Sequence, residues 1–215
     1  MKKACIIGAY PIKNTSFLKT REKDSFLVAC DGGYKTFIKE KIEPSLFVGD
    51  FDTLKKETLI HPKEVIELNP IKDDTDTLFS IKKCLSLGYD TFYLYGCSNG
   101  KIDHYLANIQ ILSFIKEHKA NGYLIDIDNN IMIFLLKDSS ITLNECDGMI
   151  SILSYSDVSI GVTLENLMYT LNNETLTNSF PLGISNQFIK NKKAKISVKE
   201  GSLLIIAPID CFKID

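Results

Sequence analysis

Short apolar runs alternate with amphipathic segments through residues 1–127. Six such runs are predicted as strands: 4–7, 26–30, 46–48, 65–68, 91–95 and 123–125. Between some of them, apolar residues recur three and four positions apart, which predicts helices with one buried face. The predicted buried faces are Leu78, Ile81 and Leu85 in one helix and Leu106, Ile109, Leu112 and Ile115 in another. Strands that alternate with helices predict a doubly wound, mostly parallel, Rossmann-like α/β domain.

The pattern changes after residue 127, where the helical period disappears. The remaining apolar or alternating runs are short, and turn residues separate them: 131–136, 139–143, 149–153, 158–164, 195–198 and 203–206. Glu200-Gly201 lies between the last two runs and is predicted as a hairpin turn. Residues 128–215 are therefore predicted to form a small all-β sandwich after the α/β domain.

Polar loops follow one predicted strand after another in the first domain. They are Asp31-Gly32-Gly33, Gly49-Asp50-Phe51-Asp52-Thr53, Asp73-Asp74-Thr75-Asp76 and the stretch 96–104. Loops at the carboxyl ends of parallel strands meet at one edge of the sheet. A single loop aspartate is more often a helix cap or a turn residue than a metal ligand. Several carboxylates on one edge favour a Mg²⁺ site for a phosphate-bearing ligand, with Asp50, Asp52 and Asp76 as the predicted metal ligands.

Two further side chains are candidates in the 96–104 stretch. Lys101 lies in a glycine-flanked loop before a helix, where a cation and backbone donors can meet phosphate. His104 follows Asp103 and could pair with that carboxylate, transfer protons or have only a structural role. The chain has neither a Walker-type phosphate loop nor a dinucleotide fingerprint, and zinc-ligand spacing is also missing.

Composition narrows the class of protein. The net charge of −2 gives no electrostatic case for nucleic acid or an anionic membrane. The six cysteines include no CxxC pair, so we expect free thiols in a reducing cytoplasm. We expect neither a signal peptide nor a membrane span, because no apolar stretch approaches the roughly 20 residues that a span requires.

The ordered set of motifs resembles the thiamine pyrophosphokinase family. In the first domain the matching motifs are Asp31-Gly32-Gly33, Gly49-Asp50-Phe51-Asp52-Thr53 (GDFDS in the family), Lys72-Asp73-Asp74-Thr75-Asp76 (KDxTD) and Asp103-His104 (the DH of GGRxDH). In the second they are Tyr169-Thr170-Leu171 (YPL), Leu182-Gly183-Ile184-Ser185-Asn186 (GxSNE) and Glu200-Gly201-Ser202-Leu203-Leu204 (GxLL). The resemblance implies transfer of pyrophosphate from ATP to thiamine with Mg²⁺, and a homodimer whose active sites lie between subunits.

The resemblance also implies roles for individual residues. Asp50, Asp52 and Asp76 would hold Mg²⁺, and Lys101 would neutralise phosphate oxygens. Asp31 or Asp103 would take the hydroxyl proton or orient the substrate. The other expected binding residues are Asp73, Thr75 and His104 on the ATP side and Ser185 and Asn186 on the thiamine side.

The chain departs from the family pattern at three points. Lys101 replaces an arginine, Gln187 replaces a glutamate, and the chain has no tryptophan. An aromatic ring stacked on thiamine would therefore belong to Tyr169, Phe180 or Phe188. Two alternatives stay open: a metal-dependent phosphatase or nucleotide hydrolase, and a non-catalytic protein that binds thiamine or thiamine diphosphate. The aspartate-nucleophile phosphatase motif fits poorly, since Leu54 stands where that motif has Thr or Val.

Overall fold

The apolar runs of residues 1–127 form one parallel sheet. The structure is a computed structural model that describes residues 1–50, 62–69 and 73–212. Within these residues the strands are β1 (Lys3–Ile7), β2 (Ser25–Cys30), β3 (Leu46–Gly49), β4 (Glu64–Glu67), β5 (Thr91–Tyr95) and β6 (Asn121–Asp126). Their order is β6-β5-β1-β2-β3-β4, and every neighbouring pair is parallel. The predicted parallel pairing of these strands is confirmed, and their carboxyl ends share one edge.

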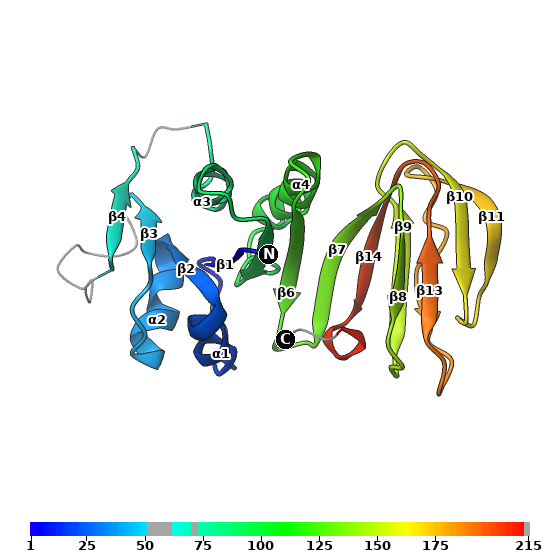
Figure 1. The fold of residues 1–215 in the computed structure, drawn as a ribbon, viewed down its shortest axis with the longest axis horizontal. Helices are drawn as coiled ribbons and strands as arrows, with labels where there is room; N and C mark the ends of the chain where they lie inside the picture. Colours follow the sequence, from blue (N-terminus) through cyan, green and yellow to red (C-terminus); the bar gives the residue numbers. More distant parts are fainter. Residues whose placement is uncertain (51–61, 70–72, 213–215) are drawn as a thin grey trace. The chain divides into compact units, whose positions relative to one another are not determined.

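Helices flank this sheet. They are α1 (Phe17–Asp24), α2 (Tyr34–Glu40), α3 (Asp76–Ser86) and α4 (Ile102–Glu117), with a short 3₁₀ turn η1 (Asp31–Gly33) after β2. In Figure 1, α1 and α2 lie below the strands and α3 and α4 lie above them. The helices therefore cover both faces of the sheet.

The predicted buried face of α4 is confirmed at Leu112 and Ile115 and wrong at Leu106. Leu106 is 55 % exposed, and the buried positions are Asn108, Ile111, Leu112 and Ile115. The spacing of three and four holds, but a polar residue occupies the first buried position. Asn108 is accommodated there because its side-chain amide donates to the carbonyl of Cys97, 2.8 Å away.

The predicted buried face of α3 is confirmed at Ile81, but its fully buried neighbours are not the predicted leucines. Its buried residues are Ser80, Ile81 and Cys84, while Leu78 and Leu85 are only partly buried. Ser80 tolerates full burial because its hydroxyl donates to the carbonyl of Asp76, 2.7 Å away.

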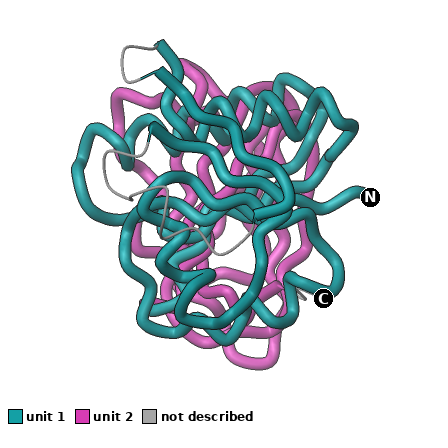
Figure 2. The backbone as a smooth tube through the Cα atoms, turned by 90° about the vertical axis from the view of Figure 1, so that its left-hand side faces the viewer, with its two compact units in different colours: residues 1–128 teal, residues 129–215 magenta. Residues whose placement is uncertain are grey.

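Residues 129–215 form a second unit that contains strands but no α-helix among its described residues (Figure 2). The strands are β7 (Ile131–Lys137), β8 (Ser140–Leu143), β9 (Met149–Ser154), β10 (Val158–Glu165), β11 (Leu171–Thr177), β12 (Asn186–Gln187), β13 (Ala194–Ser197) and β14 (Ser202–Pro208), followed by the 3₁₀ turn η3 (Ile209–Cys211). They pair antiparallel in the orders β12-β9-β14-β7 and β11-β10-β13-β8. The all-β prediction for this part is confirmed.

The predicted hairpin at Glu200-Gly201 is wrong. Strand β13 pairs with β8 and β10, whereas β14 pairs with β7 and β9, so the turn carries the chain from one sheet to the other. Gly201 has a φ of +102°, and its N–H donates to the carboxylate of Asp138, 2.8 Å away. These contacts let the chain cross between the sheets where local sequence suggests direct pairing.

The second unit has a core of alternating side chains. Leu203 and Ile205 of β14 and Val162 of β10 are at most 1 % exposed.

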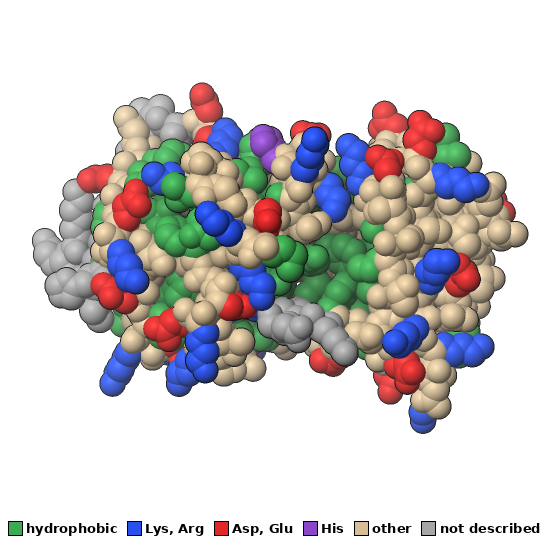
Figure 3. All heavy atoms as spheres, viewed as in Figure 1, with side chains coloured by type: hydrophobic (Ala, Val, Ile, Leu, Met, Phe, Trp, Pro, Cys, Tyr) green, Lys and Arg blue, Asp and Glu red, His purple; other side chains and the backbone are tan. Residues whose placement is uncertain are grey.

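Among the described residues of the whole chain, no helix is long and apolar enough to span a membrane. In the view of Figure 3, acidic and basic side chains are interspersed and form no basic stripe.

Candidate active site

Asp31 lies at the carboxyl edge of the sheet, directly after β2. It has a φ of +42°, and its side chain is partly buried. Among the described residues, its Oδ1 atom is buried and has no hydrogen-bond partner. A buried carboxylate oxygen without a donor or cation is costly, so this atom is suited to a positively charged or donating ligand.

Glycines shape the backbone around Asp31. A Cβ atom at Gly33 would lie 2.1 Å from the carbonyl oxygen of Ile7. Because glycine has no Cβ atom, η1 can pack closely against the end of β1. A Cβ atom at Gly49 would lie 3.2 Å from the Cα atom of Asp31. The two glycines therefore allow the ends of β1, β2 and β3 to approach closely.

Asp50 follows β3 and is partly buried beside this edge. The strand register pairs Cys30 with Val48, so Asp31 lies level with Gly49 and next to Asp50 along the edge. Asp52 lies outside the described residues, so the structure does not place the third carboxylate of the predicted metal set. Among the described residues, no group of three or more His, Cys, Asp or Glu side chains could hold a metal ion.

Asp76 begins α3 and comes to the same edge. The Cys30 thiol, one residue before Asp31, lies 3.7 Å from the Asp76 carbonyl oxygen and 3.2 Å from the Ser80 hydroxyl. Thr75 is the helix cap, because its hydroxyl oxygen accepts from the Leu78 N–H at 3.2 Å. The structure thus brings Asp31, Asp50 and Asp76 to one edge, and it gives the capping role to Thr75.

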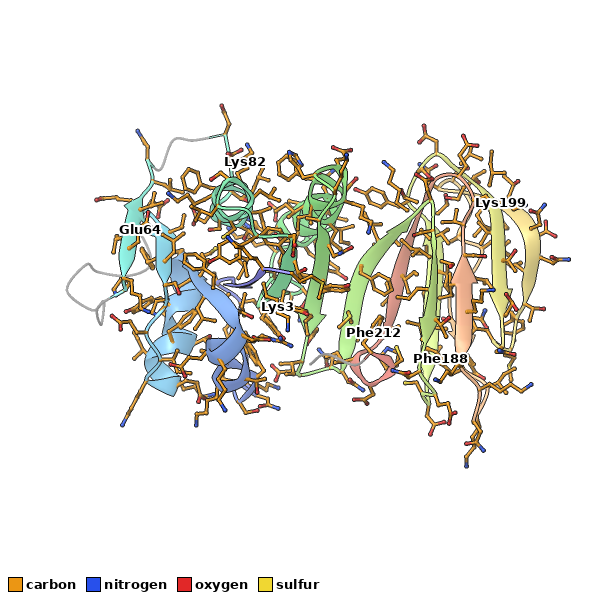
Figure 4. All side chains as sticks on the ribbon, in the orientation of Figure 1. Lys3, Glu64, Lys82, Phe188, Lys199 and Phe212 are labelled. Atoms are coloured by element: carbon orange, nitrogen blue, oxygen red, sulfur yellow. The ribbon has the colours of Figure 1, made fainter. Side chains whose placement is uncertain are left out.

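A hollow of about 430 Å³ adjoins the start of α3. The residues around it are Leu68, Asn69, Asp73, Asp74, Phe79 and Lys82. Lys82, labelled on α3 in Figure 4, contacts both carboxylate oxygens of Asp74 at 2.8 Å. Asp73 therefore lines the hollow. The charge of Asp74 is neutralised by Lys82, a residue that sequence reasoning missed. Lys82 lies eight positions after Asp74, too far along the chain for the sequence to signal this pairing.

The 96–104 stretch is fixed by two asparagines that sequence reasoning also missed. Asn99 donates to the carboxylate of Asp126 at 2.7 Å, and the buried Asn108 donates to Cys97, as described above. The available signal for Asn108 was its position three and four residues before the apolar Ile111 and Leu112. Both bonds tie the loop after β5 to neighbouring elements.

The cationic and acidic candidates of this stretch are exposed. Lys101 precedes α4 at the N-cap position without a side-chain capping bond, and Asp103 and His104 lie in its first turn. Asp103 accepts a hydrogen bond from the backbone N–H of His104 at 2.8 Å. Their side chains can therefore reach a ligand at the carboxyl edge.

In the second unit, the two thiamine-side candidates differ in exposure. Ser185 is exposed and has a φ of +57°. Asn186 is 2 % exposed, and its side chain accepts from the Tyr169 N–H at 3.0 Å and donates to the Tyr169 carbonyl at 2.7 Å. Asn186 therefore fixes the backbone that presents the Tyr169 ring, which is 65 % exposed.

The three candidate aromatic rings can also be separated. Phe188, labelled in Figure 4, is 9 % exposed, whereas Phe180 is as exposed as Tyr169 at 65 %. Of the three candidates, Tyr169 and Phe180 therefore present a large exposed ring surface, and Phe188 does not.

Comparisons with known proteins identify the family of the chain. Residues 17–124 match the family model described as thiamin pyrophosphokinase, catalytic domain, and residues 138–203 match thiamin pyrophosphokinase, vitamin B1 binding domain. The chain is 27 % identical over 193 residues to thiamine pyrophosphokinase of Bacillus subtilis, which covers 88 % of this chain and 90 % of that protein.

Solved structures support the fold. The crystal structure of Bacillus subtilis thiamine pyrophosphokinase superposes with a TM-score of 0.84 at 24 % identity, covering 97 % of this chain and 100 % of that one. Thiamin pyrophosphokinase from Candida albicans gives a TM-score of 0.81 at 17 % identity, covering 97 % and 89 %. With family models matched in both units, the chain belongs to the thiamin pyrophosphokinase family.

Proposed function

We infer that the chain transfers pyrophosphate from ATP to the hydroxyl of thiamine, giving thiamine diphosphate and AMP. The observation that carries this conclusion is the match of both family models, one to the catalytic and one to the vitamin-binding part. The strand order and the placement of helices on both faces also support a doubly wound, Rossmann-like first unit. We propose that the first unit binds ATP and the second binds thiamine.

The carboxyl edge suits Mg²⁺ by its chemistry. Its candidate ligands are all carboxylate oxygens, the donors that Mg²⁺ prefers. The buried, unpartnered Oδ1 atom of Asp31 adds a negative charge that a nearby cation would compensate. We assign Asp50, Asp52 and Asp76 as the residues that would hold the ion, with Asp31 beside them. Bound there, Mg²⁺ would neutralise phosphate charge during the transfer.

The remaining ATP-side residues would position the nucleotide. Lys101 is exposed at the start of α4, so its ammonium group can neutralise phosphate oxygens. Asp73 adjoins the hollow beside α3, and His104 lies in the first turn of α4. Thr75 would contribute mainly by capping α3 and thereby holding Asp76. Asp103, exposed beside Lys101, is assigned to take the proton of the thiamine hydroxyl.

On the thiamine side, we assign ring stacking to Tyr169. The two hydrogen bonds from Asn186 hold its backbone, so the ring is presented with little loss of freedom on binding. Ser185 is exposed and can donate a hydrogen bond to the pyrimidine. Asn186 would then act through Tyr169 and need not touch thiamine directly.

We also propose a homodimer with active sites between subunits. The second unit carries several large apolar side chains that are 44–65 % exposed: Met168, Tyr169, Phe180, Leu182 and Ile184. Exposed apolar clusters are typical of interaction surfaces. Mixing Asp50→Asn with Tyr169→Ala subunits tests this, because hybrid dimers should regain activity only if each site draws on both chains. We place the protein in the cytoplasm, in keeping with its six free cysteines.

The activity itself is tested by incubating the protein with ATP and Mg²⁺, with and without thiamine, and separating the nucleotides. We expect AMP release that requires thiamine, and its loss in Asp50→Asn. The matched control is Asp138→Asn in the second unit. The carboxylate of Asp138 accepts a hydrogen bond from the backbone N–H of Gly201. AMP release without thiamine, or release of free phosphate, would contradict the assignment.

A further inference from the structure

Two cysteines of the second unit, Cys146 and Cys211, lie near each other and have no role in the proposed reaction. The loop 144–148 between β8 and β9 runs along η3. At one end, the Asn144 N–H donates to the carbonyl of Cys211 at 3.0 Å. At the other, a Cβ atom on Gly148 would lie 3.5 Å from the side chain of Pro208. Cys146 lies midway between these two contacts, so the backbone holds it against η3.

The two thiol groups are neighbours, since each contributes to the electrostatic environment of the other, and the Cys146 thiol donates to the carbonyl of Asp147 at 3.3 Å. Cys211 is 1 % exposed, and its thiol also donates to the Pro208 carbonyl at 2.8 Å. Cys146 is partly exposed, so a small molecule in solution can reach its sulfur. The other four cysteines, Cys5, Cys30, Cys84 and Cys97, are all buried. The chain therefore has one accessible thiol with a buried thiol beside it.

We propose that Cys146 and Cys211 form a reversible disulfide by exchange with a low-molecular-weight disulfide. The Cys146 thiol loses its proton and attacks one sulfur of the small disulfide, which expels one small thiolate. The Cys211 thiolate then attacks the Cys146 sulfur of this mixed disulfide and expels the second small thiolate. The two cysteines are oxidised by two electrons, the small disulfide is reduced to two thiols, and these take up the two protons.

Local structure permits the bond. A disulfide requires the sulfur atoms to approach to about 2 Å. The loop 144–148 has no regular secondary structure, so it can move to bring the two sulfur atoms together. The product would link η3 to the residues that lead into β9. Because β9 pairs with β12 and the Gly148 carbonyl accepts from the Phe188 N–H at 3.2 Å, the link would restrain the strand that carries Asn186.

Local charge sets the expected selectivity. Burial raises the pKa of the Cys146 thiol, and the carboxylates of Asp210 on η3 and Asp147 on the loop raise it further. The reactive thiolate is thus a minor form near pH 7, and the exchange should accelerate as the pH rises toward 9. The same carboxylates attract a cationic disulfide such as cystamine and repel the anionic oxidised glutathione.

The test uses the full chain in its reduced form. The protein is incubated at pH 7 and pH 9 with cystamine or oxidised glutathione, then denatured, and its free thiols are counted and its peptides mapped by mass spectrometry. We expect the count to fall from six to four, with a direct link between Cys146 and Cys211. The reaction should be several-fold faster with cystamine and at pH 9.

Variants separate the steps. Cys146→Ser should keep all five remaining thiols free, and Cys211→Ser should stop at a mixed disulfide on Cys146. Cys84→Ser, at a buried site in the first unit, is the control and should form the link as the wild type does. A wild-type chain that accumulates only mixed disulfide at Cys146, or that loses thiols equally at all six cysteines, would overturn the proposal. This wild-type measurement decides the question even if a variant folds poorly.

Discussion

Replacing Asp31 with asparagine should stabilise the ligand-free protein while it impairs the reaction. Asparagine tolerates the +42° φ of this position, so the backbone need not change. The substitution removes a charge whose Oδ1 atom is buried and lacks a hydrogen-bond partner among the described residues. The amide keeps a polar atom at this place but carries no charge, and its lower cost of burial should add about 1–3 kcal/mol to the free energy of unfolding. For a protein of this size, that corresponds to a rise in Tm of about 3–10 °C.

The assay is thermal unfolding by circular dichroism with and without Mg²⁺ and ATP, combined with turnover measurements. Ligands should raise the Tm of the wild type more than that of Asp31→Asn, and the variant should lose at least about tenfold in kcat/KM, or about 1.4 kcal/mol. Asp138→Asn is the matched control, because Asp138 also has a positive φ of +46° but its carboxylate accepts from the Gly201 N–H. An Asp31→Asn variant that is less stable than the wild type without ligand, or that is fully active, would refute the reasoning.

Three further substitutions test interactions within the first unit. Thr75→Ala removes the cap of α3 and should lower the free energy of unfolding by about 1 kcal/mol in urea titration, with Thr75→Ser close to the wild type. Asn108→Ala leaves the Cys97 carbonyl without its buried donor and should cost about 1–3 kcal/mol by the same titration, together with a higher KM for ATP. For Asp24, burial opposes ionisation, but the hydrogen bond from Lys3 at 2.7 Å and neighbouring cations outweigh it and lower the pKa. Asp24→Asn should therefore destabilise the protein at pH 7, and the difference should vanish as the pH falls below the usual value of 3.8, since a lowered pKa stabilises only the ionised form.

The position of the carboxyl edge could be predicted from sequence because its signals are local. Apolar runs mark the strands, polar residues follow them directly, and parallel pairing then brings Asp31, Asp50 and Asp76 to one edge. The same reasoning separated the α/β part from the β part, since the helical period stops at a definite point.

The failures concern interactions between distant residues. On α4, Asn108 is buried where Leu106 was predicted, and it bonds to the Cys97 carbonyl, eleven positions earlier in the chain. Glu200-Gly201 looked like a hairpin turn, but strand pairing is decided by partners elsewhere in the second unit. The sequence also could not reveal that the Asn186 amide is occupied by the Tyr169 backbone.

The central claim is tested most directly with ATP that carries a labelled β-phosphorus, incubated with Mg²⁺, thiamine and the protein. The account predicts that the label appears in thiamine diphosphate while one AMP is released for each thiamine consumed. Label found in inorganic phosphate or pyrophosphate, or in ADP, would contradict it.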